Sequence, residues 1–519
     1  MAQQVGAGSI GLGQKLQRVV SASPDALALR YPDGRSLSNT ELYALVCRMA
    51  TGILARGVKA RQVMALVNRK SPEGLATMLA CNKLGVLYTN IDPESPPERA
   101  QRILDRCKPV LILVDDGAVA PYATMLGEFA GLAHSMSATI AAQTDDSALA
   151  HHDNDAAITG TDGAYIMFTS GSTGFPKGAV MTQDNVLHFV EWGARELRVG
   201  PGDVLTNVNP IYFDNSVFDL YVSLYNGAAI CPFTPEQVKD ARGLVRMVDA
   251  AQCTFWFSVP SMLVYLLTMR ALERGSFKHL RAIMFGGEGF AKARLKELHG
   301  LFGERVELLN AYGPTECTCI CSAYPITAAD FADMENLAPL GHLAPGFYPV
   351  IDALDPAEPD FGELLLGGSH VGSGYFNDPE RTATSFVQDP TEPNYRKIVY
   401  RTGDLVQRDP QGRLHFKGRR DNQIKHMGYR IELEEIEAAF NALDVVQEAG
   451  VVYHRDHLGT GSIQAFVRTV DKTEEDQLRG SLSKRLPTYM MPRRIHFMDM
   501  LPKNQSGKID RQQLKALCT

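Results

Sequence analysis

The chain lacks the features that mark membrane, secreted and nucleic-acid-binding proteins. Residues 1–20 have no basic segment followed by an apolar run, so we expect no secretory signal. No apolar stretch approaches the ~18 residues of a membrane-spanning helix, so we expect no membrane span. Lysine and arginine total 52 against 59 acidic residues, and the net charge of −7 makes nucleic acid an unexpected partner.

The nine cysteines form neither a disulfide framework nor paired CxxC motifs, which favours a reducing compartment, and we expect the cytoplasm. Cys317, Cys319 and Cys321 alternate with period two, which predicts a strand with three thiols on one face. A soft-metal site normally needs ligands from two segments. We therefore interpret these thiols as small core or pocket-lining side chains.

The 519 residues, 45% of them hydrophobic and 21% charged, are enough for a large globular core and more than one folding unit. Short apolar runs read as buried strands, among them 63–67, 110–114, 164–168 and 254–259. They alternate with helical patterns such as 40–55 and 293–302, which predicts an α/β protein with mostly parallel sheet. No repeat of 20–50 residues is present, which disfavours a solenoid or propeller.

The predicted pattern of secondary structure changes after about residue 340. Segment 353–368 reads as turns and short antiparallel strands, and 399–421 reads as a hairpin with a turn at 409–412. The tail predicts helix at 431–443, strands at 448–454 and 462–470, and helix at 474–486. These patterns predict a large body, residues 1–420, and a small α+β lid, residues 421–519.

Residues 168–178, FTSGSTGFPKG, follow an apolar strand and combine glycines, hydroxyls and Lys177. Glycines let backbone N–H groups approach an anion, hydroxyls donate further hydrogen bonds, and a lysine adds positive charge. Pro176 and Gly178 flank the lysine, so this is not the GK[ST] phosphate loop. By itself the segment also fits an ordinary surface loop.

Nine segments in order resemble the adenylate-forming superfamily of acyl-CoA synthetases, luciferases and nonribosomal peptide adenylation domains. They are KLGVLYTNIDPESPPER (83–99), FTSGSTGFPKG (168–178), FDNSVFD (213–219), NAYGPTE (310–316), GELLLGGSHVGSGYFNDPERTATSF (362–386), YRTGD (400–404), GRRDNQIKHMGYRIELEEIE (418–437), LPTYMMP (486–492) and LPKNQSGKIDR (501–511). The chain looks most similar to stand-alone amino-acid adenylation enzymes such as D-alanine–carrier protein ligases. The resemblance implies a body of βαβ subdomains plus a β-rich subdomain, and a mobile lid.

The implied reaction is attack of a substrate carboxylate on the α-phosphorus of ATP, with pyrophosphate as the leaving group. A carboxylate is already nucleophilic at neutral pH, so the enzyme must neutralise phosphate charge and align the reacting atoms rather than supply a general base. By resemblance, the residues that hold the β- and γ-phosphates are Thr169, Ser170, Gly171, Ser172, Thr173 and Lys177.

The resemblance assigns the adenosine site to Gly287, Glu288, Asn310, Ala311, Tyr312 and Gly313. Tyr312 would stack on adenine and Asn310 would bond its exocyclic amine, although a buried core aromatic before a Gly-Pro turn is the alternative for Tyr312. Thr315 would contact the α-phosphate, and Glu316 would ligate Mg²⁺ through a hard carboxylate oxygen.

Three further residues receive roles from the resemblance. Asp404, with Arg419 beside it, would bind the ribose, although an aspartate after Thr-Gly is often a plain turn former. Lys508 would be the catalytic lysine that bridges the substrate carboxylate and the α-phosphate. Asp421 would be the hinge about which the lid rotates, bringing the segment around 425–428 to the site for thiol attack.

Segment 213–219, FDNSVFD, is the main evidence for an amino-acid substrate, because by resemblance Asp214 matches the superfamily's amine-binding aspartate. A buried carboxylate needs a cationic partner or several hydrogen bonds, and a substrate ammonium provides both. The alternative for Asp214 is an N-cap for the helix predicted after it. By resemblance, the substrate pocket is lined by Phe213, Asp214, Asn215, Phe218, Ser258, Met284, Gly286, Ala311, Cys319 and Ile320. Its other members are uncharged, which predicts a neutral side chain. The bulk of Phe218 and Met284 favours a small or medium one, although Gly286 gives some space back.

Several alternatives remain open at this stage. Gly286 stands where the D-alanine ligases commonly have a cysteine. D-alanine as substrate, and the chirality of the substrate in general, therefore stay open, and a β-amino or imino acid is also an alternative. No carrier-domain motif follows the lid, so we expect a separate phosphopantetheinylated carrier protein, or coenzyme A, as acceptor. An acyl- or aryl-CoA synthetase is the second hypothesis, and Asp214 argues against it. A degenerate binding protein is the third, and intact Lys177, Glu316, Asp404 and Lys508 argue against that.

Overall fold

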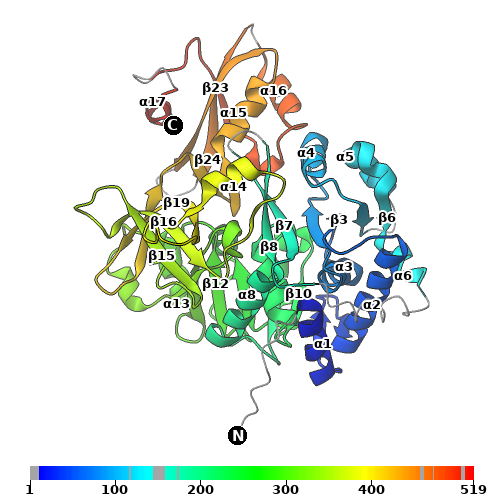
Figure 1. Cartoon of the computed structure of the whole chain (residues 1–519). Helices are drawn as coiled ribbons and strands as arrows, with labels where there is room; N and C mark the ends of the chain where they lie inside the picture. The colour runs from blue at the N-terminus through cyan, green and yellow to red at the C-terminus, as the bar shows by residue number, and fades with distance from the viewer. Residues whose placement is uncertain are drawn as a thin grey trace.

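The computed structural model describes residues 11–115, 119–143, 158–171, 175–455, 461–470, 473–503 and 509–518. Figure 1 shows a large body, coloured blue through yellow, with a smaller lobe in orange and red at one end. This arrangement confirms the predicted α/β class and the large body followed by a small C-terminal domain. Within the described ranges, no helix has both the length and the apolarity needed to cross a bilayer.

Two largely parallel sheets form the centre of the body. The seven-stranded sheet has the order β17 (Gly374–Tyr375), β8 (Lys177–Thr182), β7 (Gly163–Thr169), β4 (Leu87–Ile91), β3 (Val63–Val67), β5 (Leu111–Val114) and β6 (Ala133–Ser135). The eight-stranded sheet has the order β14 (Ser322–Pro325), β13 (Glu307–Tyr312), β12 (Ala282–Gly286), β11 (Phe255–Ser258), β9 (Val204–Asn207), β10 (Ala229–Pro232), β1 (Leu27–Arg30) and β2 (Ser36–Ser38).

Helices cover these sheets and join them through one apolar core. That core takes buried side chains from both sheets and from α1 (Leu12–Ala22), α2 (Asn39–Ala55), α3 (Pro72–Lys83) and α8 (Gln183–Glu196). All five residues of β3 are buried, as expected of a parallel strand covered on both faces. The predicted helix at 293–302 is α13 (Lys292–Phe302), so the alternating pattern identified these elements correctly.

The β-rich subdomain is the antiparallel sheet β15 (Phe347–Ala353), β16 (Phe361–Gly368), β19 (Ile398–Arg408) and β18 (Phe386–Gln388), with β20 (Leu414–Arg419) paired to β19. The hairpin predicted at 399–421 is confirmed. Its turn is closed by Gly412 N–H donating to the Asp409 carbonyl at 2.8 Å, where Gly412 has a φ of 79° that suits glycine.

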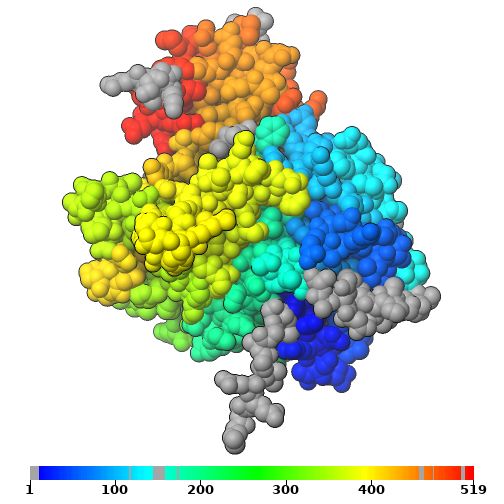
Figure 2. Space-filling model, in the orientation of Figure 1, coloured from blue at the N-terminus to red at the C-terminus, as the bar shows by residue number. Residues whose placement is uncertain are grey.

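The lid begins with a two-stranded hairpin, β21 (Gln423–His426) and β22 (Tyr429–Glu432). A three-stranded sheet follows, β23 (Val446–Arg455), β24 (Gly461–Thr469) and β25 (Arg494–Phe497), and its core includes α15 (Leu433–Asn441) and α16 (Glu475–Leu482). The final helix is α17 (Arg511–Ala516). Figure 2 shows this lobe projecting from one end of the body.

The strand predicted through Cys317, Cys319 and Cys321 is wrong. Residues 315–317 form a short 3-10 turn, and Thr318 and Cys319 follow with φ values of 58° and 73°, so β14 begins only at Ser322. Two consecutive left-handed residues turn the chain and cannot continue a strand. All three thiols are buried and Cys319 lines a cavity, which confirms the interpretation as core and pocket-lining side chains.

Candidate active site

A narrow cavity lies where β12, β13 and the 315–320 turn of the body meet the β21–β22 hairpin of the lid. Its volume is about 50 Å³, room for no more than a few water molecules. The predicted site residues on its wall are Asp214, Asn215, Gly286, Gly287, Ala311, Tyr312, Gly313, Thr315, Cys319, Ile320, Asp404 and Arg419. Residues spread over 206 positions of sequence thus meet at one point, because the parallel strands β12 and β13 end there.

Asp214 is bound by a neighbouring hydroxyl and does not cap a helix. It precedes α9 (Asn215–Val217) with a φ of −64° and makes no capping hydrogen bond, so the N-cap alternative is wrong. Instead, Thr315 donates its hydroxyl to Asp214 Oδ2 at 2.6 Å. Burial raises the pKa of Asp214, and the Thr315 hydroxyl opposes that rise. The carboxyl group is therefore costly to ionise until a cation joins it.

Four residues expected in the substrate pocket lie elsewhere. Phe218 opens a π-helical segment (Phe218–Val222) and packs against Phe255 and Phe257, with ring centroids 5.4 and 5.2 Å away. Met284 is fully buried in the same apolar core. Phe257, which the motif did not indicate, lies on the cavity wall.

The other two, Phe213 and Ser258, contact the lid and line a different cavity, respectively. Phe213 packs edge-on against Tyr429 of the lid, with ring centroids 4.9 Å apart. The Ser258 hydroxyl accepts from the indole of Trp256, and Ser258 lines a different cavity of about 550 Å³. Motif spacing assigns positions along the chain, but the π-helix and the ends of the strands decide which way each side chain points.

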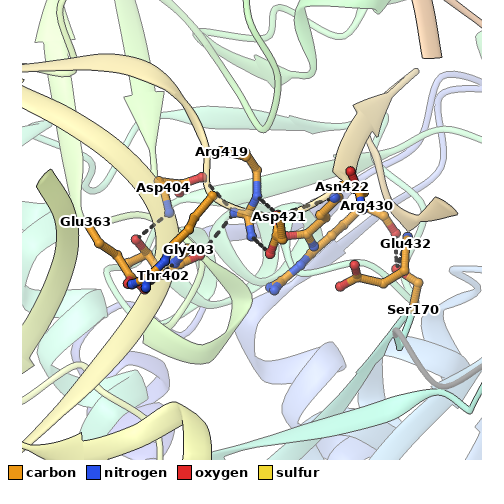
Figure 3. A network of polar contacts seen from close by, with 12 residues as sticks. Ser170, Glu363, Thr402, Gly403, Asp404, Arg419, Asp421, Asn422, Arg430 and Glu432 are labelled. Atoms are coloured by element: carbon orange, nitrogen blue, oxygen red, sulfur yellow. Dashed lines mark hydrogen bonds and ion pairs between the residues drawn. The ribbon is translucent and has the colours of Figure 1, made fainter. Parts of the chain in front are cut away.

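Tyr312, Asp404 and Arg419 form a second polar group at the cavity (Figure 3 shows Asp404 and Arg419). Tyr312 donates its hydroxyl to Asp404 Oδ2 at 2.6 Å, and Arg419 donates to Asp404 Oδ1 at 2.7 Å. Burial, followed by the adjacent Asp404, raises the pKa of Tyr312, so the phenol remains a donor. Both oxygens of Asp404 are thus occupied by protein groups with the lid in this position.

An adjoining cavity of about 370 Å³ fits the predicted adenosine site. Its wall includes the predicted residues Gly287, Glu288, Asn310, Ala311, Tyr312 and Arg419. The Asn310 amide donates to the Pro339 carbonyl at 2.8 Å, and Glu288 accepts from the backbone N–H of Ser261 and of Gly428. From the lid, Lys425 places its ammonium 5.7 Å from the Tyr312 ring centroid.

Glu316 is fully buried at the centre of a charged cluster. Tyr375 donates to its Oε1 at 2.6 Å, the Lys177 ammonium lies 3.5 Å from the same oxygen, and Arg430 donates to its Oε2 at 2.7 Å. Burial alone would raise the pKa of Glu316, but Arg430 and Lys177 outweigh burial and hold it well below the usual range. Burial and the neighbouring Arg430 lower the pKa of Lys177 to about 8.

The phosphate loop also contacts the lid. Ser170 donates its hydroxyl to the Arg430 carbonyl at 2.6 Å and accepts from Glu432 N–H at 3.2 Å (Figure 3). Gly171 N–H donates to Glu435 Oε2 at 3.2 Å. The Thr169 hydroxyl is buried and has no hydrogen-bond partner among the described residues. Ser172 and Thr173 lie outside the described residues.

The lid presents its hairpin to the body. Glu435 also pairs with Arg99 of α4 (Pro97–Cys107), and both side chains are buried. Asp421 lies between β20 and β21 and accepts from Arg419 Nε and Nη2 at 2.7 and 2.6 Å.

Lys508, the predicted catalytic lysine, lies outside the described residues. Its described neighbours in sequence, Lys503 and Ile509, pair with each other, and Ile509 packs on the lid sheet.

The residues around Glu316 allow a test for a metal. In the described ranges, no group of three or more His, Cys, Asp or Glu side chains is arranged to hold an ion. Mg²⁺ commonly uses one or two carboxylates together with substrate phosphates, so Glu316 beside the phosphate loop suits that mode in principle. With the lid in this position, however, both oxygens of Glu316 are occupied by protein donors.

Two family models match the chain: "AMP-binding enzyme" over residues 16–376 and "AMP-binding enzyme C-terminal domain" over residues 435–508. The first alone covers more than half of the chain. The chain belongs to the AMP-binding enzyme family. This confirms the predicted superfamily. The junction predicted at 420/421 falls between the two matched ranges and stays a prediction.

Similar proteins agree with this assignment of an AMP-binding enzyme. The L-proline–[L-prolyl-carrier protein] ligase of Pseudomonas fluorescens is 32% identical, over 95% of each chain. Surfactin synthase subunit 2 of Bacillus subtilis is 30% identical over 97% of this chain, which spans only 14% of that subunit's length. In fold, an adenylation–PCP di-domain fusion from Klebsiella oxytoca superposes with a TM-score of 0.81, at 22% identity and 93% coverage of each chain.

In this AMP-binding enzyme, the lid segment 425–428 lies at the site as expected, but sequence reasoning did not name Gln423 and Arg430. Gln423, Lys425, Gly428 and Arg430 line the same cavity as Asp214. The motif at 418–437 signalled that this segment approaches the site, but not which side chains enter it. Neighbouring residues of a strand point to opposite faces, so Tyr429 and Arg430 lie on opposite sides of the hairpin. Which of them enters the cavity is known only once the face of the hairpin that contacts the body is known.

Proposed function

We propose that this chain activates a small or medium neutral amino acid as aminoacyl-AMP, with release of pyrophosphate, and then transfers it to a carrier-protein thiol. The observation that carries the proposal is Asp214, buried on the cavity wall. Burial raises the pKa of Asp214 by more than the neighbouring cations Lys425 and Arg430 lower it, so its charge is only partly compensated by the described residues. A substrate ammonium would supply the missing cation.

The first half-reaction needs charge neutralisation and alignment. Thr169, Ser170, Gly171 and Lys177 would hold the β- and γ-phosphates of ATP, together with Ser172 and Thr173. Thr315, hydrogen-bonded to Asp214, would contact the α-phosphate and so place it beside the substrate carboxylate. Tyr312 would stack on adenine, and Asp404 and Arg419 would bind the ribose. When bound at Glu316, Mg²⁺ would screen phosphate charge. Lys508 would support the transition state.

The small volume of the cavity and the uncharged part of its wall support a small neutral side chain, while Asp404, Arg419, Lys425 and Arg430 line the part that we assign to the nucleotide and the lid. Phe257, Ala311, Cys319 and Ile320 contribute an uncharged wall. Gly286 does not add much room, since a Cβ there would lie 2.6 Å from the Ala311 carbonyl oxygen of the neighbouring strand. A glycine at this position is therefore explained by the close approach of β12 and β13, and it does not by itself specify chirality.

A cavity of about 550 Å³ on the body–lid junction supports a pantetheine acceptor. Its wall is mostly apolar, with Ile211, Val259 and Met262 from the body and Met427 and Tyr429 from the lid. The 32% identical relative is named as a ligase that acts on a prolyl-carrier protein, which also supports a separate carrier as partner. Nine free thiols favour a reducing compartment, and we propose the cytoplasm. Asp421 would be the hinge.

The experiment that tests this function is ATP–pyrophosphate exchange with the L-, D-, β- and imino acids, and with fatty and aryl acids, as separate substrates. We expect exchange with one small neutral amino acid or a few of them. Exchange with fatty or aryl acids alone would replace this proposal with an acyl- or aryl-CoA synthetase, for which Asp214 has no ammonium to bind.

A further inference from the structure

The lid contributes one cation to the buried carboxylate of the body. Arg430 of β22 donates to Glu316 Oε2 at 2.7 Å, although the two residues are 114 positions apart in sequence. The Arg430 side chain is only 17% exposed and the Glu316 side chain is fully buried. An ion pair this enclosed is strong only if its geometry is fixed, because each charge has lost its water.

Backbone contacts fix that geometry. Ser170 binds the Arg430 carbonyl at 2.6 Å, and the Glu432 N–H returns a hydrogen bond to the same hydroxyl at 3.2 Å. The β22 strand is therefore held against the phosphate loop on both sides of Ile431. When the hairpin is docked, its backbone is already fixed in the position that places the Arg430 guanidinium against Glu316.

The docked arrangement does not fit Mg²⁺ at Glu316. Mg²⁺ requires oxygen ligands at about 2.0–2.1 Å in octahedral geometry. Oε2 is bound by Arg430, and Oε1 is bound by Tyr375 at 2.6 Å with Lys177 at 3.5 Å. Two protein cations, Arg430 and Lys177, already lie next to this carboxylate. A dication cannot join the cluster until Arg430 leaves.

We propose that Arg430 is a positioning residue that takes the place of Mg²⁺ at Glu316 when the lid docks, so that metal occupancy and the docked lid exclude each other. This inference rests on the proposed function, because it links adenylate formation to thiol transfer. When the metal leaves with pyrophosphate, Glu316 would become free to bind Arg430. The thiol-accepting arrangement would then be stabilised at the moment when it is needed.

Hydrogen exchange of the full chain, followed by mass spectrometry, tests the exclusion directly. Three amides report docking: Gly428 N–H to Glu288, Glu432 N–H to Ser170 and Gly171 N–H to Glu435. The probe is inorganic pyrophosphate with MgCl₂, compared with pyrophosphate and EDTA at equal ionic strength. In the wild type we expect Mg²⁺ to speed exchange in the 423–435 peptide about tenfold or more, as expected if docking loses ~1.4 kcal/mol.

Arg430→Gln should exchange quickly in this peptide with or without Mg²⁺. Arg430→Lys keeps the charge without the guanidinium fork and should retain part of the response. The matched control is Arg485→Gln, which removes another lid–body ion pair, 3.3 Å from Glu98, in which Glu316 takes no part, and this variant should keep the Mg²⁺ response. Unchanged exchange in strands such as β7 verifies that each variant is folded.

Two results would overturn the inference: protection of the wild-type hairpin that Mg²⁺ does not alter, or an Arg430→Gln variant with the full Mg²⁺ response. The proposed function fails separately, if no amino acid supports pyrophosphate exchange in the wild type. With the same substrates, Arg430→Gln should lower the rate of thioester formation from preformed aminoacyl-AMP about tenfold more than it lowers the rate of amino-acid-dependent pyrophosphate exchange.

Discussion

Thr315 and Asp214 share a hydrogen bond of 2.6 Å across 101 residues of sequence. The hydroxyl predicted to meet the α-phosphate is thus bound to the carboxylate predicted to meet the substrate amine. An amino acid whose ammonium binds Asp214 has its carboxylate one carbon away, within reach of that phosphate. With both residues in the roles we propose, this juxtaposition would supply the alignment on which a reaction without a general base depends.

Replacing Asp214 tests the amine site. Asp214→Asn keeps the shape and the hydrogen bond from Thr315 but removes the charge, leaving a bound ammonium without its partner. We expect kcat/KM for the amino acid to fall about 100-fold or more, the effect of breaking a buried ion pair. The KM for ATP should change little. Asp33→Asn, on an exposed surface carboxylate, is the control, and an unaltered amino-acid KM in Asp214→Asn would refute the assignment.

Two variants of Tyr312 separate the ring from the hydroxyl. Tyr312→Phe keeps a stacking ring but leaves Asp404 Oδ2 without its donor, so we expect a loss of about 1–3 kcal/mol in unfolding free energy and a nearly unchanged KM for ATP. Tyr312→Ala should raise the KM for ATP about tenfold, from loss of stacking. Equal ATP affinity in Tyr312→Ala and the wild type would return Tyr312 to an ordinary core aromatic.

The lysine near the C-terminus can be tested against a neighbour. Lys508→Ala should slow adenylate formation about 100-fold or more, the effect of losing one donor to developing negative charge. Transfer from preformed aminoacyl-AMP should continue, since the docked hairpin contacts the site through Lys425 and Arg430. Lys503→Ala, which removes an ion pair with Glu448 on the lid, is the control. Pyrophosphate exchange at the wild-type rate in Lys508→Ala would contradict the role.

Docking of the lid should depend on Glu435. This carboxylate accepts from Gly171 N–H and pairs with Arg99, so Glu435→Gln weakens two lid–body contacts at once. We expect thioester formation to fall about tenfold while pyrophosphate exchange is retained. Glu434→Gln is the matched control, because Glu434 is the adjacent residue of α15 and pairs within the lid with Asn422 and Arg511. Equal thioester rates in the two variants would exclude this contact as a determinant of docking.

His370 makes the fold sensitive to acid. It is buried against Phe347, with ring centroids 4.6 Å apart, and burial together with His188 lowers its pKa to about 4. The unfolded chain, with a pKa near 6.5, binds the proton first as the pH falls. The stability that this group contributes is therefore complete above about pH 6.5 and lost toward pH 4, by on the order of 3 kcal/mol.

His370→Phe keeps the stacked ring without a titrating group. Denaturant unfolding between these pH values should show a shallower loss of stability than the wild type. His279→Phe, at an exposed position, should leave the slope unchanged. A wild-type slope in His370→Phe would show that other groups set the acid sensitivity.

The sequence by itself determined the family, the α/β class, the main strands and helices, and the residue types that chemistry with phosphates and an amino acid requires. The fold class and the elements follow from local properties, because hydrophobic period and turn residues act within a few positions. The family and the site residues follow from the resemblance of nine ordered segments to the motifs of the superfamily. Twelve of the predicted site residues accordingly lie on one cavity wall.

Only the tertiary structure decided which way side chains point and what they meet. The left-handed pair Thr318 and Cys319 breaks the expected strand, and the π-helix directs Phe218 into the core while Phe257 takes a place on the wall. Arg430 reaches Glu316 because a hairpin of one domain docks on a loop of another. Such contacts depend on how separate units pack, and the energy of that packing is not written in any local stretch of sequence.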